Sequence, residues 1–222
     1  MMRQFFTPLT ILTALMFMYA PVMIASALYE STMGLVQKIF YFHVPSWFAM
    51  FTGVFVSGIA SALFLFKGRR DADRVAVSAA EVAVLFGAIG LVTGPLWGRK
   101  AWGMWWTWDA HLTLALLLEL IFIGYLLVRK YGGPGSDKLS AAMALFGTVN
   151  VPFVYVSSNI WRTLHPQTTT VTTLKAGMFG AFWYCVAAFM LLFTLLLTLR
   201  VHLEDQRARL DELYLAEEGG TV

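Results

Sequence analysis

Apolar residues in this chain form long runs that are separated by short polar segments. Six of these runs approach the roughly 20 mostly apolar residues that an α-helix needs to cross a bilayer. They are residues 9–29, 45–66, 75–95, 111–128, 139–157 and 177–199. The pattern predicts an all-α integral membrane protein with six transmembrane helices. It divides the chain into a transmembrane domain, residues 1–199, and a charged tail, residues 200–222, expected to lie in the cytoplasm.

Composition supports the membrane assignment. The 222 residues are 59% hydrophobic and 13% charged, and their mean hydropathy is +0.68. Soluble domains average about 45–50% apolar and about 25% charged residues. The single cysteine, Cys185, lies inside an apolar run, which excludes a disulfide framework within the chain. No Cys-x-x-Cys-His motif is present, so the chain is not itself a c-type haem protein.

The first apolar run allows two interpretations. Arg3 precedes it and Ala25-Ser26-Ala27 resembles a signal-peptide cleavage site. Its apolar core is long for a signal peptide, so we favour a retained first helix.

The positive charges predict how the helices are oriented. Alternate connections carry eleven lysines and arginines on one side and five on the other. Because cytoplasmic loops are enriched in these residues, we expect both termini in the cytoplasm. The segments near 30–44, 96–110 and 158–176 then face outward.

Residues 97–109, WGRKAWGMWWTWD, hold five of the eight tryptophans, namely Trp97, Trp102, Trp105, Trp106 and Trp108. Tryptophan is common at membrane–water interfaces, so an aromatic belt is one interpretation. Five in so short a run favour a platform for a large flat ligand, on an outward-facing loop between helices 3 and 4. Asp109 is expected to cap the fourth helix; it can also fix the indole N–H groups or receive a partner protein.

Two of the four histidines are predicted at the same depth as this stretch. His43 and His165 lie at the outer ends of the second and fifth helices. Two imidazoles beside aromatic surface can form an axial pair for haem iron; ordinary hydrogen bonding is the alternative for each. His111 is expected to hydrogen-bond near the tryptophans rather than to bind metal, and His202 lies in the tail.

Other charged residues complete the candidate chemistry. Haem propionates need cationic partners, and Arg99, Lys100 and Arg162 are predicted on the correct side. Solvated topological charges are the alternative for these three residues. Glu81 and Glu119 lie within predicted spans, which makes them functional candidates without an obvious partner. The chain has no nucleotide-binding glycine loop and no Ser-His-Asp pattern, so ATP hydrolysis would fall to another chain. No nucleic-acid partner is expected.

The tryptophan stretch resembles the WWD signature of haem-handling proteins. Together with Phe42-His-Val-Pro45 and Trp161-Arg-Thr-Leu-His165, it resembles the cytochrome c maturation protein C family, CcmC. The resemblance covers essentially the whole chain. One departure is His111, because the family usually has arginine after Trp-Asp-Ala. That leaves a propionate or partner contact at this position in doubt.

The resemblance implies a function in haem delivery rather than catalysis. Haem b, as a transported ligand, would sit at the periplasmic face of the inner membrane, its iron held by His43 and His165 against the tryptophans. The implied partners are membrane lipid, a periplasmic haem chaperone (CcmE), ATP-binding cassette subunits (CcmA and CcmB) and the small membrane protein CcmD. Two alternatives remain: a small haem lyase that attaches haem to apocytochrome c, and a non-haem permease or quinone-reactive anchor.

Overall fold

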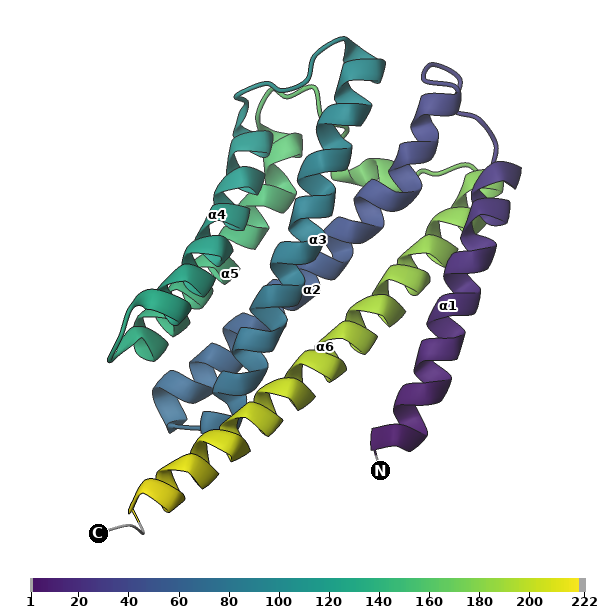
Figure 1. Cartoon of the computed structure of the whole chain (residues 1–222). Coiled ribbons are helices and arrows are strands. Elements are labelled where there is room, and N and C mark those ends of the chain that lie inside the picture. The colour runs from purple at the N-terminus through teal and green to yellow at the C-terminus, as the bar shows by residue number, and fades with distance from the viewer. Residues whose placement is uncertain (1, 220–222) are drawn as a thin grey trace.

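The computed structural model describes residues 2–219, with the side chains of all of these except 2–4, 169, 218 and 219. Within that part of the chain no strand forms, and six helices are long and apolar enough to cross a membrane (Figure 1). They are α1 (Met2–Ser26), α2 (Phe40–Lys67), α3 (Arg70–Trp102), α4 (Ala110–Tyr131), α5 (Ser136–Ile160) and α6 (Ala176–Gly219). Two short 3-10 helices, η1 (Leu35–Ile39) and η2 (Thr168–Val171), lie in the connections. The predicted six-helix fold is confirmed.

Helix α2 lies at the centre of the bundle. It packs along α3 and also contacts α5 and α6, while α4 packs along α5 and α1 along α6. Met50 of α2, Phe86 of α3 and Phe122 of α4 are fully or almost fully buried in the main core. Figure 1 shows α6 crossing the bundle obliquely, with α1 on its outer side. Helices α2 and α3, which carry much of the site described below, are the most deeply buried of the six.

Three connections gather at one end of the bundle, which we call the site end: residues 27–39, 103–109 and 161–175. The beginning of α1 and the end of α6 lie at the opposite end (Figure 1). Lys38 fastens the end of α1 here, because its Nζ donates to the carbonyl oxygens of Ala27 (2.8 Å), Ala25 (3.1 Å) and Ile24. Lysines near the end of a helix can hydrogen-bond its last carbonyls in this way.

Ion pairs join helices toward the opposite end. The pairs are Arg70–Asp137 (2.7 Å), Arg74–Asp205 (2.6 Å), Arg129–Asp73 and Arg200–Glu81. Glu81, which had no obvious partner in the sequence, thus pairs with an arginine of α6. Residues 200–219, expected to form a charged tail, continue α6 without a break.

The tryptophan stretch corrects one expectation. Helix α3 continues to Trp102, so only residues 103–109 form the connection, and the prediction that the whole stretch is a loop is wrong for residues 97–102. The helix ends at Gly103, whose φ of 78° is the left-handed conformation common after a helix. Arg99 Nη1 donates to the Gly103 carbonyl at 2.6 Å. The length of an apolar run predicts the part of a helix that lies in lipid, and α3 extends beyond it.

Candidate functional site

Glycines of α3 allow His43 to lie directly against that helix. His43 stands in the first turn of α2 and is 5% exposed. A Cβ atom on Gly94 would be 3.2 Å from His43 Cε1, and one on Gly90 would be 2.6 Å from the indole of Trp47. Small residues permit such close approach between membrane helices. The glycine face of α3 therefore sets the position of the first candidate ligand.

Asp109 fixes the segment that carries His165. Its Oδ1 accepts the backbone N–H of Leu112 at 3.0 Å, which confirms the expected N-cap of α4. Its Oδ2 accepts the hydroxyls of Thr107 at 2.9 Å and Thr163 at 2.7 Å. Thr163 Oγ1 in turn accepts the backbone N–H of His165 at 3.0 Å. One carboxylate thus joins the tryptophan connection, the start of α4 and residues 163–165.

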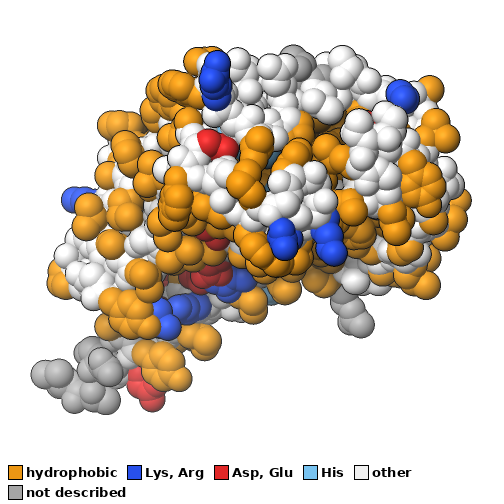
Figure 2. Space-filling model, turned by 90° about the horizontal axis from the view of Figure 1, so that it is seen from above, with side chains coloured by type: hydrophobic (Ala, Val, Ile, Leu, Met, Phe, Trp, Pro, Cys, Tyr) orange, Lys and Arg blue, Asp and Glu red, His pale blue; other side chains and the backbone are white. Residues whose placement is uncertain are grey.

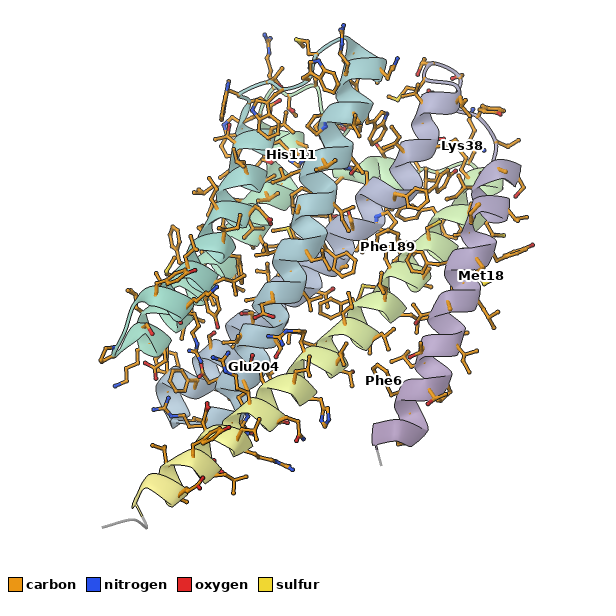
Figure 3. All side chains as sticks on the ribbon, in the orientation of Figure 1. Phe6, Met18, Lys38, His111, Phe189 and Glu204 are labelled. Carbon is orange, nitrogen blue, oxygen red and sulfur yellow. The ribbon has the colours of Figure 1, made fainter. Side chains whose placement is uncertain are left out.

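Three imidazoles meet at the site end. The ring centroids of His43 and His165 are 6.4 Å apart, and those of His165 and His111 are 4.0 Å apart with an interplanar angle of 31°. Figure 3 shows His111 near the beginning of α4, close to residues 103–109. The two predicted ligands are therefore neighbours, and a third histidine joins them.

Hydrogen bonds select the same tautomer for His43 and His165. Thr93 Oγ1 gives its proton to the Ile89 carbonyl at 2.7 Å, so His43 Nδ1, 2.9 Å from that oxygen, must donate. His165 Nδ1 lies 2.8 Å from the Pro166 carbonyl, which can only accept. In both rings the proton is on Nδ1 and Nε2 keeps its lone pair. This is the form in which histidine binds a metal, with its second nitrogen held by a protein acceptor.

Two cavities adjoin these histidines. The larger has a volume of about 540 Å³ and the smaller about 70 Å³. His43, His111, His165, Trp47 and Trp97 line both. Cavities of roughly 300–1,000 Å³ are typical of sites for small molecules and cofactors. The imidazoles thus lie where a large ligand can reach them.

The larger cavity is mainly aromatic on its inner side and polar near the connections. Phe48 and Phe51 of α2 and Trp183 of α6 supply aromatic surface. Polar groups come from Glu30 in the 27–39 connection and from Thr168 and Lys175 in the 161–175 connection. Such a lining suits a ligand with a broad apolar body and a charged edge. Seen from the site end, hydrophobic side chains cover much of the surface, with a few lysines and arginines between them (Figure 2).

Residues 1–215 match the protein family CcmC, described as heme exporter protein C. The chain belongs to the CcmC family. The heme exporter protein C of Bradyrhizobium diazoefficiens is 33% identical over 196 residues, which cover 84% of this chain and 74% of that protein. That of Escherichia coli (strain K12) is 29% identical over 192 residues, 80% of this chain and 76% of that protein. That of Rhodobacter capsulatus is 29% identical over 216 residues, which cover 93% of this chain and 86% of that protein.

The five tryptophans of residues 97–109 divide into two groups. Trp97 is 5% exposed and packs beside His43 (centroids 5.8 Å apart) and Trp102 (5.8 Å). Trp106 is half-buried and contacts Trp108 edge-on at 5.8 Å. Trp97, Trp102, Trp105 and Trp106 line the smaller cavity, whereas Trp108 is 77% exposed and lines neither. The indole N–H groups of Trp97 and Trp106 are buried without a partner among the described residues, so both remain available as donors.

The predicted cations lie outside the cavity lining. Arg99, Lys100 and Arg162 are exposed and line neither cavity, and Arg99 is bonded to the Gly103 carbonyl. Lys175 supplies a positive charge to the lining of the larger cavity. Sequence reasoning placed Lys175 on the outward side without giving it a role. Glu119 is 2% exposed in the core and lines neither cavity.

His111 lines both cavities but makes other hydrogen bonds than expected. It was expected to hydrogen-bond within the tryptophan loop, whereas its Nδ1 lies 2.8 Å from Ser157 Oγ and 3.1 Å from the Val154 carbonyl of α5. One signal in the sequence indicated its closeness to His165. His111 lies in the first turn of α4, at the same depth in the membrane as the end of α5 and the start of residues 161–165.

The surroundings of His165 keep its side chain neutral. Burial, and after it the neighbouring imidazoles of His111 and His43, lower the pKa of His165 to about 3. Burial opposes ionisation of Asp109, yet hydrogen bonds from Leu112, Thr163 and Thr107 hold the pKa of that carboxyl below its usual value. At neutral pH the site therefore combines an uncharged imidazole with an ionised carboxylate that fixes its segment.

Proposed function

We propose that this CcmC family member binds haem b at the site end and delivers it to a CcmE-type periplasmic haem chaperone. The observation that carries the proposal is the pair formed by His43 and His165, each with Nε2 unprotonated, beside a cavity of about 540 Å³. The names of the relatives, heme exporter protein C, support haem as the cargo. The protein acts as a transport component, and its partner subunits hydrolyse ATP.

The spacing of the two rings suits a single iron ion. Metal–imidazole bonds of about 2.0–2.1 Å, extended by the distance from nitrogen to ring centre on each side, place the centroids of a trans pair roughly 6.3 Å apart. The His43 and His165 centroids are 6.4 Å apart. Little movement of either ring toward or away from the other is then needed for both to bind one iron.

The surroundings favour binding that is specific and still reversible. His43 is packed between Trp47 and Trp97 and hydrogen-bonded to Thr93, so its orientation is fixed. His165 lies on an irregular segment that Asp109 holds through Thr163. An imidazole of the chaperone can replace His165 on the iron while His43 remains bound. This exchange explains delivery without a covalent step on this chain.

The tryptophans and cations have distinct proposed roles. We propose that Trp97, Trp102, Trp105 and Trp106 support the macrocycle and that exposed Trp108 faces the chaperone. Lys175 lines the larger cavity, which supports a proposed contact with a propionate. Arg99, Lys100 and Arg162 remain proposed propionate or partner contacts at the surface.

The membrane setting and partners follow from charge and family. The excess of lysine and arginine on the side of the termini supports cytoplasmic termini and a periplasmic haem site in the bacterial inner membrane. We propose that the chain works in a complex with CcmA, CcmB and a CcmD-type small protein.

The test is the visible spectrum of the detergent-purified protein after haem addition, for the parent, His43→Ala and His202→Ala. His202, on α6 beyond the ion pair of Arg200, is the matched control. We expect low-spin, six-coordinate haem in the parent and the control, and loss of that spectrum in His43→Ala. In cells, His43→Ala should load the chaperone at a small fraction of the parent rate. A parent that binds no haem, or a His43→Ala variant with an unchanged spectrum, refutes the proposal.

A further inference from the structure

We propose that His111 is a third iron-binding imidazole, which shares with His165 the axial position opposite His43. This inference rests on the proposed haem binding and assigns a role to a side chain outside the predicted pair. His111 and His165 line the same two cavities as His43. Their centroids lie 4.0 Å apart and their planes are tilted by 31°, so the two rings are in direct contact.

The hydrogen bonds of His111 prepare it for this role. Ser157 Oγ donates to the Val154 carbonyl at 2.6 Å, so it has no further proton to give. His111 Nδ1, 2.8 Å from Ser157 Oγ and 3.1 Å from that carbonyl, must therefore carry the proton. Its Nε2 is left with a lone pair and has no hydrogen bond to the described residues. The same arrangement is found in His43 and His165.

Two imidazoles in contact cannot both occupy one coordination position, so they must alternate. Their supports differ. His111 belongs to the first turn of α4, which Asp109 caps, and it is tied to the end of α5. His165 belongs to a connection and depends on the contact between Thr163 and Asp109. Side chains on helices hold a site more firmly than those on loops. His111 can therefore keep the iron six-coordinate when residues 161–165 move away from it.

The consequence is a relay within one chain. With His165 bound, the connection is closed over the haem; with His111 bound, the connection is free to open without loss of the cargo. The iron changes one neutral imidazole for another, so neither its charge nor its coordination number changes. The energy barrier for release of the haem is then lower, because His111 replaces His165 and the iron is not left without a ligand at that position.

The experiment compares four haem-loaded proteins in detergent: the parent, His165→Ala, His111→Gln and the double variant. Visible and electron paramagnetic resonance spectra report the coordination state. We expect the parent and both single variants to be low-spin with two histidines, and the double variant to be high-spin. A parent that binds no haem would refute the proposed function itself. A His165→Ala protein that is high-spin, like the double variant, would refute the role of His111 alone.

An imidazole titration guards against misfolded variants. Added imidazole should convert the double variant to a low-spin species, which shows that its site is intact. In His165→Ala, His111 already fills the sixth position, so millimolar imidazole, about the effective concentration of a tethered side chain, should leave the low-spin spectrum unchanged. A His165→Ala protein that imidazole converts from high-spin to low-spin would overturn the proposal.

Discussion

Thr93→Val tests the physical basis of iron binding at His43 without touching the ligand. Valine has nearly the shape of threonine but lacks the hydroxyl that accepts the proton of His43 Nδ1 at 2.9 Å. His43 is 5% exposed, so water does not readily replace that acceptor. The substitution leaves the ring free to turn or to move its proton to Nε2, the nitrogen needed by the iron.

The size of the effect follows from two considerations. Leaving a buried donor without a partner costs about 1–3 kcal/mol. In the haem-free variant, His43 avoids part of this cost by moving its proton to Nε2, and haem binding must then reverse that change. Loss of the second-shell partner of a metal-binding histidine typically reduces affinity by about 10–100-fold. We expect an effect in this range, which corresponds to about 1.4–2.7 kcal/mol.

The assay is a haem titration of the detergent-purified protein followed by its visible spectrum. Thr93→Ser is the matched control, because it keeps the hydroxyl and removes one methyl group. We expect Thr93→Ser to bind within a few-fold of the parent and Thr93→Val to bind about 10–100-fold more weakly. Parent-like affinity of Thr93→Val would show that the hydrogen bond does not prepare His43 and would remove the tautomer argument.

Three further substitutions test the structure around the site and at the opposite end, by thermal unfolding in detergent. Gly90→Ala places a Cβ 2.6 Å from an indole of α2 and should cost about 1–3 kcal/mol; Gly180→Ala, with nothing within 4 Å, should leave the midpoint unchanged or raise it. Asp73→Asn removes the charge of a buried carboxylate whose partner, Arg129, is partly exposed, and should cost about 1–3 kcal/mol. Asp71→Asn, at an exposed pair, should leave the midpoint unchanged; equal midpoints of the two variants would contradict this. The pKa of Asp109 is lowered, so its stabilising effect is complete above its unfolded pKa of about 3.9 and is lost as the pH falls through the lower folded value. Asp109→Asn should lower the midpoint at pH 7 and flatten its decline below about pH 4; an unchanged pH profile would contradict the assignment.

The sequence by itself determined the class of fold, because the length of an apolar run is set by the thickness of the bilayer. Six runs predicted six helices, and all six are present. Asp109 was identified as the cap of α4 from its type and position, which are local properties. The end of α3 was not predicted, because an apolar run marks only the part of a helix that lies in lipid, whereas α3 continues to Gly103, whose left-handed conformation ends it.

Only the tertiary structure decided which outward residues meet. The sequence placed His43 and His165 at one depth, but the 6.4 Å between their rings depends on the rotation of α2 against α3 and on the contact of Thr163 with Asp109. The contact of His111 with His165 depends on the antiparallel packing of α4 and α5. In a soluble protein an apolar stripe would reveal the buried face of each helix. In lipid the outer face is as apolar as the core, so hydrophobicity does not specify that rotation, and only packing does.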